Sequence, residues 1–424
     1  MTDFASIREE FPILDQQIHG HPLVYLDSAA TSQKPQCVID AEAEFYRTIN
    51  AGVHRGAHEL AARSTMAFEE ARAKMARLVG ANAAGGEEEV VVTSGATAGL
   101  NLLATAFGNA SLGRGGAAAK RFALKLGDEI VVSKAEHHSV LLPFQELAAR
   151  TGASLKWFDL DDEGRIRSDS ADEVITERTK IVAVTHVGNT TGAITDIAPI
   201  IRRAHEVGAV FILDACQSVP HLKVDFHALD VDFAAWSAHK MYGPTGVGFL
   251  YGKRDMLEAL PPANFGGSMV ELAWMDQEAR YMEPPARFEA GTQPVAQVVA
   301  AGVAADWLMA IGMENLEAHE RTITDELLAL GDIEGVRILG PRSNERRIGT
   351  IAFEVEGVHP HDVGQFIDAQ GIAIRVGHHC AQPVHRHFGV YASNRASSGI
   401  YNAVEDAQAL IETVKQVRPF FGVK

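Results

Sequence analysis

Two short apolar runs, one followed by a carboxylate and the other by an amine, most constrain the fold that this chain can adopt. Residues 209–213 (AVFIL) and 231–236 (VDFAAW) are rich in β-branched and aromatic residues. Such runs are typical of buried parallel strands. Asp214 directly follows the first run, and Ser237 and Lys240 follow the second. We therefore expect these groups to meet at the carboxyl edge of one α/β sheet, where open sheets bind ligands.

An acid and an amine at one sheet edge suit pyridoxal phosphate. The aldehyde of that cofactor forms a Schiff base with a lysine, and a carboxylate keeps its ring nitrogen protonated so that the ring accepts electrons. Lys240 and Asp214 supply both groups, and they are 26 positions apart, enough for one crossover between parallel strands. The alternative is that Asp214 caps a helix and Lys240 is a solvated lysine at a strand end.

Length and patterning predict an α/β protein with two domains. A chain of 424 residues exceeds the size at which single cores usually divide. Strands and helices alternate up to Gly252, which predicts a large, doubly wound, mostly parallel sheet within residues 16–292. Residues 293–424, with 1–15, predict a smaller α+β domain. Its expected strands lie in VRILGP, IGTIAFEVEG and IAIRVGHHC, and its helices at 317–331, 361–370 and 403–417.

Charge and cysteine usage exclude several classes of partner. The chain has 38 basic and 55 acidic residues, and a net charge of −17 disfavours nucleic acid. Cys37, Cys216 and Cys380 are too few and too widely spaced for a disulfide framework, which favours a reducing, cytoplasmic compartment.

The first residues lack the pattern of an export signal, so we expect none. Residues 294–313 predict a buried amphipathic helix rather than a membrane span, because Gln297 and Asp306 interrupt the apolar run.

Two further strand ends carry candidate ligand-binding groups. In VVVTSGATAGLN a strand (Val90–Thr93) runs through a glycine turn into a helix, whose N–H groups and the Thr97 hydroxyl favour a phosphate. Many α/β proteins have this arrangement without binding phosphate. His137 follows a strand that ends at Ser133, and its ring could stack on a pyridine and move protons, or simply cap the next helix.

Polar residues elsewhere are candidates for binding an anionic substrate. Asn189 follows another strand on the same rim. His54 and Arg55 lie in a loop that could meet an anion or be plain surface. We expect Arg395 in a loop before a strand, where its guanidinium would suit the carboxylate of an amino acid. A solvated surface arginine is the alternative.

The segment RVGHHCAQPVHRHFG contains a candidate nucleophile. Cys380 follows a strand, lies beside His378 and His379, and comes five residues after Arg375. Neighbouring positive charge populates the nucleophilic thiolate. Two alternatives remain open: Cys380 is a small buried apolar residue, or it binds zinc with His378, His385 and His387. The spacing matches no known zinc finger, and we expect no metal.

Taken together, twelve motifs in order resemble the cysteine desulfurases of the class V aminotransferase fold, specifically the SUF-type branch. They are YLDSAAT, VHRGAH, TSGATAGLN, EHHS, HVGNTTG, LDACQ, SAHKMYGPTG, GGSM, RFEAGT, HPHD, RVGHHCAQP and RAS. The chain departs from the commonest pattern at Ala96, Val140 and Ala238, and residues 108–125 are longer than usual, but no reacting group is missing.

The resemblance implies a role for each candidate. Lys240 would be the Schiff-base lysine, Asp214 the partner of the ring nitrogen, His137 the stacking residue and Gln217 the contact of the phenolic oxygen. The phosphate would be held by Ala96, Thr97, Ser237 and His239, joined by Thr292 from the other subunit of a homodimer. The substrate would be bound by Ala29, His54, Asn189, Arg375 and Arg395.

The implied reaction converts L-cysteine to L-alanine and leaves the sulfur on Cys380 as a persulfide. Relatives of the SUF type pass this sulfur to a small acceptor protein for iron–sulfur cluster assembly. HPHD resembles the form found where the acceptor holds zinc and His361 displaces a zinc ligand, although His359 and His361 could equally cap the following helix. Selenocysteine lyase and cysteine sulfinate desulfinase share most of these residues, and a non-catalytic zinc-binding scaffold is an alternative of a different class.

Overall fold

The computed structural model describes residues 3–81 and 86–423, and it is built around one seven-stranded sheet. The strand order is β4-β10-β9-β8-β7-β5-β6. The strands are β4 (Val90–Thr93), β5 (Glu129–Ser133), β6 (Ser154–Phe158), β7 (Thr179–Thr185), β8 (Val210–Asp214), β9 (Phe233–Ser237) and β10 (Gly248–Gly252). Neighbouring strands are parallel except at β10, which is antiparallel to both β4 and β9. The predicted mostly parallel sheet is confirmed, with one reversed strand near its edge.

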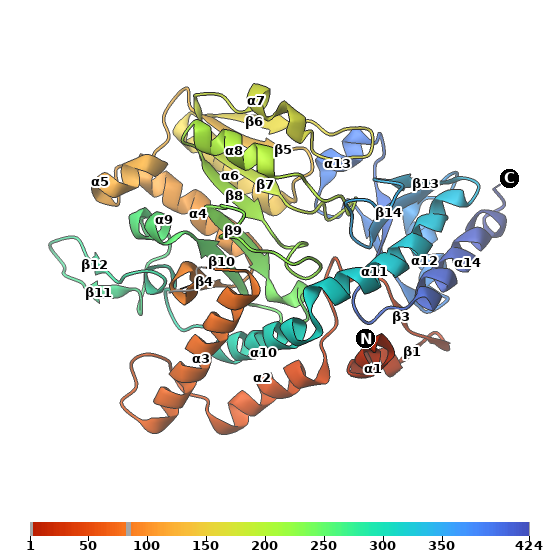
Figure 1. Cartoon of the computed structure of the whole chain (residues 1–424), viewed down its shortest axis with the longest axis horizontal. Helices are drawn as coiled ribbons and strands as arrows, with labels where there is room; N and C mark the ends of the chain where they lie inside the picture. Colours follow the sequence, from red (N-terminus) through yellow and green to blue (C-terminus); the bar gives the residue numbers. More distant parts are fainter. Residues whose placement is uncertain (1–2, 82–85, 424) are drawn as a thin grey trace.

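Helices cover both faces of this sheet because successive strand residues point to opposite sides. Along β7, Ile181 and Ala183 join one apolar cluster, and Val182 and Val184 join the other. The first cluster includes side chains of α4 (Ala96–Ser111) and α6 (His138–Thr151). The second includes side chains of α3 (Glu59–Leu78), α8 (Ala198–Glu206) and α10 (Val295–Ile311). The sheet is therefore buried on both sides (Figure 1).

A smaller four-stranded antiparallel sheet lies on the right of Figure 1. Its order is β13 (Val336–Leu339), β14 (Thr350–Val355), β17 (Ser393–Ser397) and β16 (Arg375–Gly377). It packs with α11 (Met313–Leu327), α12 (Pro360–Asp368) and α14 (Val404–Phe420). The predicted strand IAIRVGHHC is divided, since β15 (Ile372–Ala373) pairs instead with β3 (Val24–Tyr25).

The prediction that Arg395 lies in a loop is wrong, because this residue is in the middle of β17. The sequence SNRAS lacks the apolar alternation by which strands are recognised. All five of its side chains are nevertheless buried. The fold supplies hydrogen-bond partners on the face of Ser393, Arg395 and Ser397, whereas the Asn394 side chain on the other face has none within the described residues.

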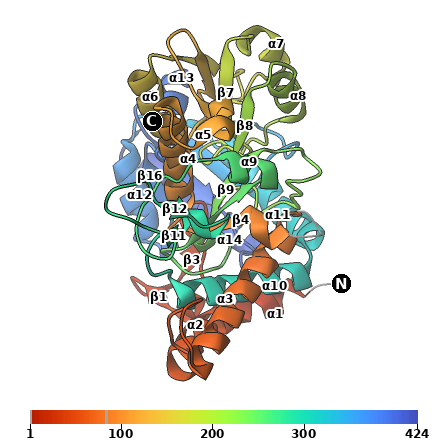
Figure 2. The same cartoon turned by 90° about the vertical axis from the view of Figure 1, so that its left-hand side faces the viewer.

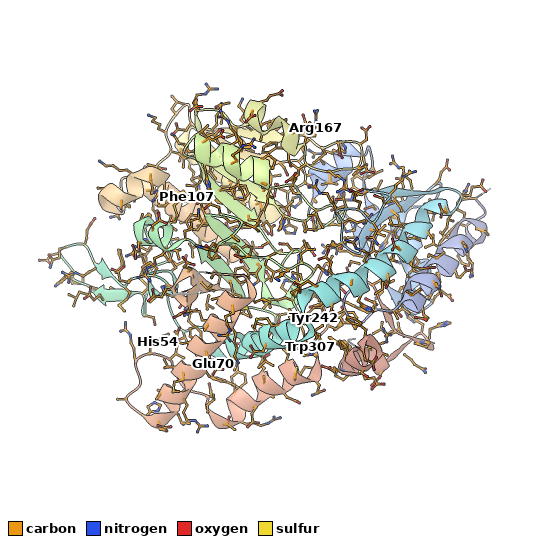
Figure 3. The ribbon with its side chains drawn as sticks, in the orientation of Figure 1. His54, Glu70, Phe107, Arg167, Tyr242 and Trp307 are labelled. Atoms are coloured by element: carbon orange, nitrogen blue, oxygen red, sulfur yellow. The ribbon has the colours of Figure 1, made fainter. Side chains whose placement is uncertain are left out.

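Helix α10 packs against α2 (Gln36–Thr48) and α3, below the large sheet in Figure 2. Most of its buried apolar residues belong to the core of the large sheet, whereas the core of the smaller unit includes Ile323 and Leu327 of α11. A domain boundary at 293 therefore stays a prediction. Along α11, the buried side chains pass from the core of the large sheet to the core of the smaller unit. Near the junction of α10 and α11, Tyr242 and Trp307 have ring centroids 5.3 Å apart (Figure 3).

The remaining elements are short. They are α1 (Phe4–Glu9), α5 (Gly116–Ala119), α7 (Ala171–Val174), α9 (Arg254–Ala259), α13 (Gln382–His387), β1 (Gln17–Ile18), β2 (His21–Pro22), β11 (Val270–Leu272) and β12 (Arg280–Tyr281). Among the described residues, no helix has by itself the length and apolar character of a membrane span. Residues Val295–Ile311 and Met313–Asp332 reach that length only as a pair bent by 79°.

Candidate active site

A cavity of about 210 Å³ opens at the carboxyl ends of the central strands. Thr185, Asp214 and Ser237 line it, and each is the last residue of its strand, in β7, β8 and β9 respectively. Lys240 lines it from the helical turn that follows β9. The strand ends predicted to meet are thus brought together at one edge of the sheet.

Few protein groups offset the charges of Asp214 and Lys240 in this cavity. The Asp214 side chain is buried, and its Oδ1 accepts the Cys216 N–H at 3.0 Å. Burial raises the pKa of Asp214, while that N–H and the charge of Lys240 oppose the rise. Within residues 3–81 and 86–423, the Lys240 amine has no hydrogen bond or ion pair. Both groups are therefore available to a bound molecule.

His137 presents a neutral ring to the cavity. It is the N-cap of α6, and its Nδ1 accepts the Ser139 N–H at 3.1 Å, so the ring proton lies on Nε2. Burial, followed by the charge of Lys240, lowers the pKa of His137 to about 3. The residue is thus both a helix cap and part of the cavity wall.

One end of the cavity is formed by the first turn of α4. The Ala96 N–H donates to Ser237 Oγ at 2.9 Å, and Thr97 Oγ1 lies 2.6 Å from Ser139 Oγ. His239 lines the same cavity, and burial, then the charge of Lys240, lowers its pKa to about 4. A helix N-terminus surrounded by hydroxyl groups and a neutral imidazole is suited to a phosphate.

The residues present fit pyridoxal phosphate. Gln217 donates through Nε2 to the Ala29 carbonyl at 2.9 Å, but its buried Oε1 has no hydrogen-bond partner in the described chain. This orphaned acceptor lies in a cavity that also holds the Asp214 carboxyl and the Lys240 amine. The phenolic oxygen, ring nitrogen, aldehyde and phosphate of the cofactor each have a counterpart in this set.

Two arginines and an asparagine lie on the side of the cavity that faces the small sheet. Arg375 lines the cavity. Arg395 is fully buried and donates to the Asn189 carbonyl at 2.9 Å and to Asp27 Oδ1 at 3.2 Å, while its Nε has no partner within the described residues. Burial lowers the pKa of Arg395 to about 10, and the Asp27 carboxylate opposes this. The side chain of Asn189 donates to the His379 carbonyl at 2.6 Å.

The Cys380 loop reaches this cavity from the small sheet. Arg375 Nη2 lies 3.6 Å from Cys380 Sγ, and the Cys380 carbonyl accepts the His138 N–H at 2.8 Å. Because Arg375 and Asn189 both line the cavity and both contact this loop, the loop lies against its wall. The thiol is thus next to the candidate cofactor site and does not face the far side of the molecule.

The neighbouring histidines do not converge on the thiol. His385 and His379 contact Ser393, His387 Nε2 lies 2.8 Å from the Asp161 carbonyl, and the His378 ring packs on Tyr391. Among the described residues, no three His, Cys, Asp or Glu side chains are arranged to bind a metal. The geometry gives no support to the zinc-scaffold alternative.

Arg395 and Cys380 contact residues of the cavity wall without lining the cavity, and three other predicted site residues lie away from it. His54 is on the loop before α3 (Figure 3), and its Nε2 is 2.7 Å from Glu69 Oε1. Thr292 is exposed. His361 is exposed in the first turn of α12, where His359 Nδ1 caps the helix by accepting the His361 N–H at 3.2 Å. Their proposed roles require other molecules.

The sequence analysis assigned no role to five residues of the cavity wall: Ala30, Ser139, Thr185, Val187 and Cys216. Thr185 had the same signal as Asp214, a polar side chain at the end of a β-branched strand. Ser139 lies two residues after His137 and is brought to the wall by the first turn of α6.

Residues 24–410 match the model of a protein family described as "Aminotransferase class-V". The chain belongs to this family. It is 46% identical over 424 residues to a probable cysteine desulfurase of Streptomyces coelicolor, covering 100% of this chain and 99% of that protein. It is 47% identical to a probable cysteine desulfurase of Mycobacterium leprae, covering 99% of this chain and 98% of that one.

Solved structures agree with this membership of the class V family. A cysteine desulfurase of Escherichia coli superposes with a TM-score of 0.87 at 36% identity over 99% of each chain. An apo cysteine desulfurase of Thermococcus onnurineus gives 0.89 at 34% identity over 98% of each. The predicted fold and the prediction of a pyridoxal phosphate-dependent enzyme of the cysteine desulfurase kind are confirmed.

Proposed function

We propose that this enzyme removes the sulfur of L-cysteine, releases L-alanine and keeps the sulfur on Cys380. The observation that carries this proposal is the contact of the Cys380 loop with the cavity wall, through Arg375 and Asn189. A thiol there is within reach of a substrate bound beside Lys240. Relatives named as cysteine desulfurases across the full length support the same activity.

Each part of the cofactor would be held by the residues that match it. Lys240 would bind the aldehyde, Asp214 the ring nitrogen, Gln217 the phenolic oxygen and His137 the face of the ring. The phosphate would be held by Ala96, Thr97, Ser237 and His239. When bound, pyridoxal phosphate supplies a ring that accepts the electron pair left at the substrate Cα when its proton is removed.

The substrate carboxylate would meet the arginines. Arg375 lines the cavity, and Arg395 is bonded to the carbonyl of the cavity residue Asn189 and has a buried Nε without a partner among the described residues. Ala29 has no side chain beyond Cβ, so the backbone at this point leaves room for the substrate. Asp27 and Asn189 fix the orientation of Arg395, which reduces the ordering needed when substrate binds.

Two residues of the chain carry the chemistry. The Lys240 amine takes the proton from the substrate Cα, which needs a general base in the cavity. The Cys380 thiolate attacks the substrate sulfur: a sulfur–sulfur bond forms, the substrate carbon–sulfur bond breaks, and protonation of that carbon gives alanine. The sum is L-cysteine plus the Cys380 thiol to L-alanine plus the Cys380 persulfide. A reducing compartment such as the cytoplasm would keep Cys380 reduced between turnovers.

A second copy of the chain would complete the phosphate site with Thr292. The exposed position of Thr292 leaves it available to another subunit. Large apolar side chains are exposed on the same part of the molecule, including Met275 at 104% and Phe265 at 62% on either side of β11. Exposed apolar surface of this kind is typical of a subunit interface. We therefore infer a homodimer, with His54 near the substrate only if the partner brings it there.

The persulfide would pass to a small acceptor protein of the SUF type, which serves iron–sulfur cluster assembly. His361 is exposed at the start of α12, and its imidazole is free to bind a zinc ion carried by that acceptor. His359 already caps the helix, so the two histidines have separate tasks. Loss of acceptor-stimulated turnover in His361→Ala, with basal turnover kept, is the expected result. Equal stimulation of the variant and the wild type would exclude this role.

One experiment tests the core of the proposal. The visible absorbance of the purified holoenzyme is recorded before and after L-cysteine is added, and alanine and Cys380 persulfide are measured. Cys380→Ser should keep the visible band and lose alanine formation. Lys240→Ala should lose the covalent link that borohydride traps. Undiminished desulfuration of free cysteine by Cys380→Ser, or trapping at another lysine, would refute the assignment.

A further inference from the structure

The turn that carries Cys380 has a backbone conformation that side chains disfavour. His379 has φ 50° and Cys380 has φ 56°, and the Ala381 N–H closes the turn on the His378 carbonyl at 2.9 Å. Two successive positive φ values are characteristic of type I′ turns, in which glycine and asparagine are preferred. Such a turn of histidine and cysteine must be held by its surroundings.

The outer side of the turn is held by the large sheet. The His379 carbonyl accepts the Asn189 side-chain N–H, and the Cys380 carbonyl accepts the His138 backbone N–H. Both donors follow strands of the large sheet at its carboxyl edge. These bonds fix the backbone carbonyls, but they do not fix the side chains on the other side of the turn.

A buried hydrogen-bonded chain holds the inner side. His379 Nε2 and His385 Nε2 each lie 2.9 Å from Ser393 Oγ, and His385 Nδ1 lies 3.1 Å from the Ala381 carbonyl. His379, His385 and Ser393 are at most 1% exposed. The chain thus joins the residue before Cys380 to the residue after it, by way of strand β17.

The direction of each hydrogen bond follows from its acceptors. A carbonyl only accepts, so His385 Nδ1 carries the proton and its Nε2 accepts the Ser393 O–H. Ser393 Oγ then accepts the N–H of His379 Nε2. Burial lowers the pKa of both imidazoles, in agreement with two neutral rings. One serine hydroxyl therefore pairs with Nε2 of both histidines, which an apolar side chain of similar size would not do.

We propose that Ser393 and His385 are positioning residues for sulfur transfer. They hold His379 and Ala381 on either side of Cys380, and so keep its Sγ beside Arg375 at the cavity wall. Ser393, Arg395 and Ser397 alternate along one face of β17, and Ser397 Oγ accepts the Ala29 N–H at 2.9 Å. One strand face thus locates the thiol, the substrate arginine and a cavity wall residue together. This inference rests on the proposed function of Cys380.

The test separates proton removal from sulfur transfer in the holoenzyme. Exchange of the Cα hydrogen of L-alanine in D₂O reports on Lys240 and the cofactor, and single-turnover persulfide formation at Cys380 reports on the thiol. In Ser393→Ala, both hydrogen bonds of this hydroxyl are lost, so persulfide formation should fall about tenfold or more. The KM for L-cysteine and Cα exchange should stay within about twofold.

Variants of His385 provide a matched series if Ser393→Ala fails to fold. His385→Asn keeps a donor for the Ala381 carbonyl, His385→Gln keeps an acceptor for Ser393, and His385→Leu keeps neither. The first two should retain more persulfide formation than His385→Leu. Equal persulfide rates throughout the series, or an equal fall in Cα exchange, would overturn the inference. Absence of a Cys380 persulfide in the wild type would instead refute the proposed function.

Discussion

Replacing Arg72 by methionine should destabilise the protein because it strands a buried carboxylate. Arg72 on α3 is paired with Glu289, and their side chains are 2% and 4% exposed. Arg72 donates to Glu289 Oε1 at 2.6 Å, to Glu289 Oε2 at 3.0 Å and to the Val90 carbonyl at 2.7 Å. In Arg72→Met, the one hydrogen-bond donor left to Glu289 among the described residues would be the Val92 N–H, at 2.7 Å.

The expected loss follows from breaking one side of a buried pair. Removing one partner costs about 3–5 kcal/mol, because the remaining charge stays desolvated. Unfolding entropy of about 2 cal/mol/K per residue gives roughly 0.9 kcal/mol/K for 424 residues, so Tm should fall by about 3–6 °C. Thermal unfolding of the holoenzyme at fixed cofactor concentration measures this.

Two variants control the interpretation. Arg72→Met with Glu289→Gln removes the stranded charge and keeps an acceptor for Val92, so at least half of the lost Tm should return. Arg114→Met breaks an exposed pair with Glu278 at 2.9 Å and should change stability by less than about 1 kcal/mol. If Arg72→Met melts like the wild type, or the double variant is as unstable as the single one, the reasoning is wrong.

Two other expectations concern titrating groups. Burial, followed by the charge of Asp214, raises the pKa of the Cys216 thiol to about 12, so only about one in ten thousand is thiolate at pH 8. Iodoacetamide should therefore label Cys380 and leave Cys216 unmodified by peptide mass spectrometry, and rapid labelling of Cys216 would contradict its raised pKa. Burial alone would raise the pKa of Glu69, but hydrogen bonds from His54 and Arg72 lower it to about 2, from 4.5. This stabilisation is complete above about pH 4.5 and is lost as the pH falls toward 2. The difference in urea midpoint between Glu69→Gln and the wild type should therefore shrink between pH 6 and pH 3. A constant difference would show that the carboxylate charge is not responsible.

The site was predictable where a strand ends in polar residues. Asp214, Ser237 and Lys240 follow apolar runs whose period is local, and parallel strands bring their carboxyl ends to one edge. Arg395 was misplaced because SNRAS has no apolar pattern, and it becomes a strand only by pairing with β14 and β16. The partner of Glu289 was also invisible, since Arg72 is far away in the sequence and the two side chains meet only in the folded core.

Sequence alone determined which groups stand at the ends of the large strands, because residue spacing fixes which side chains leave a strand together. It also identified the motifs of the class V family. The tertiary structure decided where the small sheet delivers its groups: the turn at Cys380, the Ser393 bridge and the burial of Arg395 depend on contacts between distant segments. Such contacts form when the chain folds, because hydrogen bonds between buried polar side chains leave no periodic signal in the sequence.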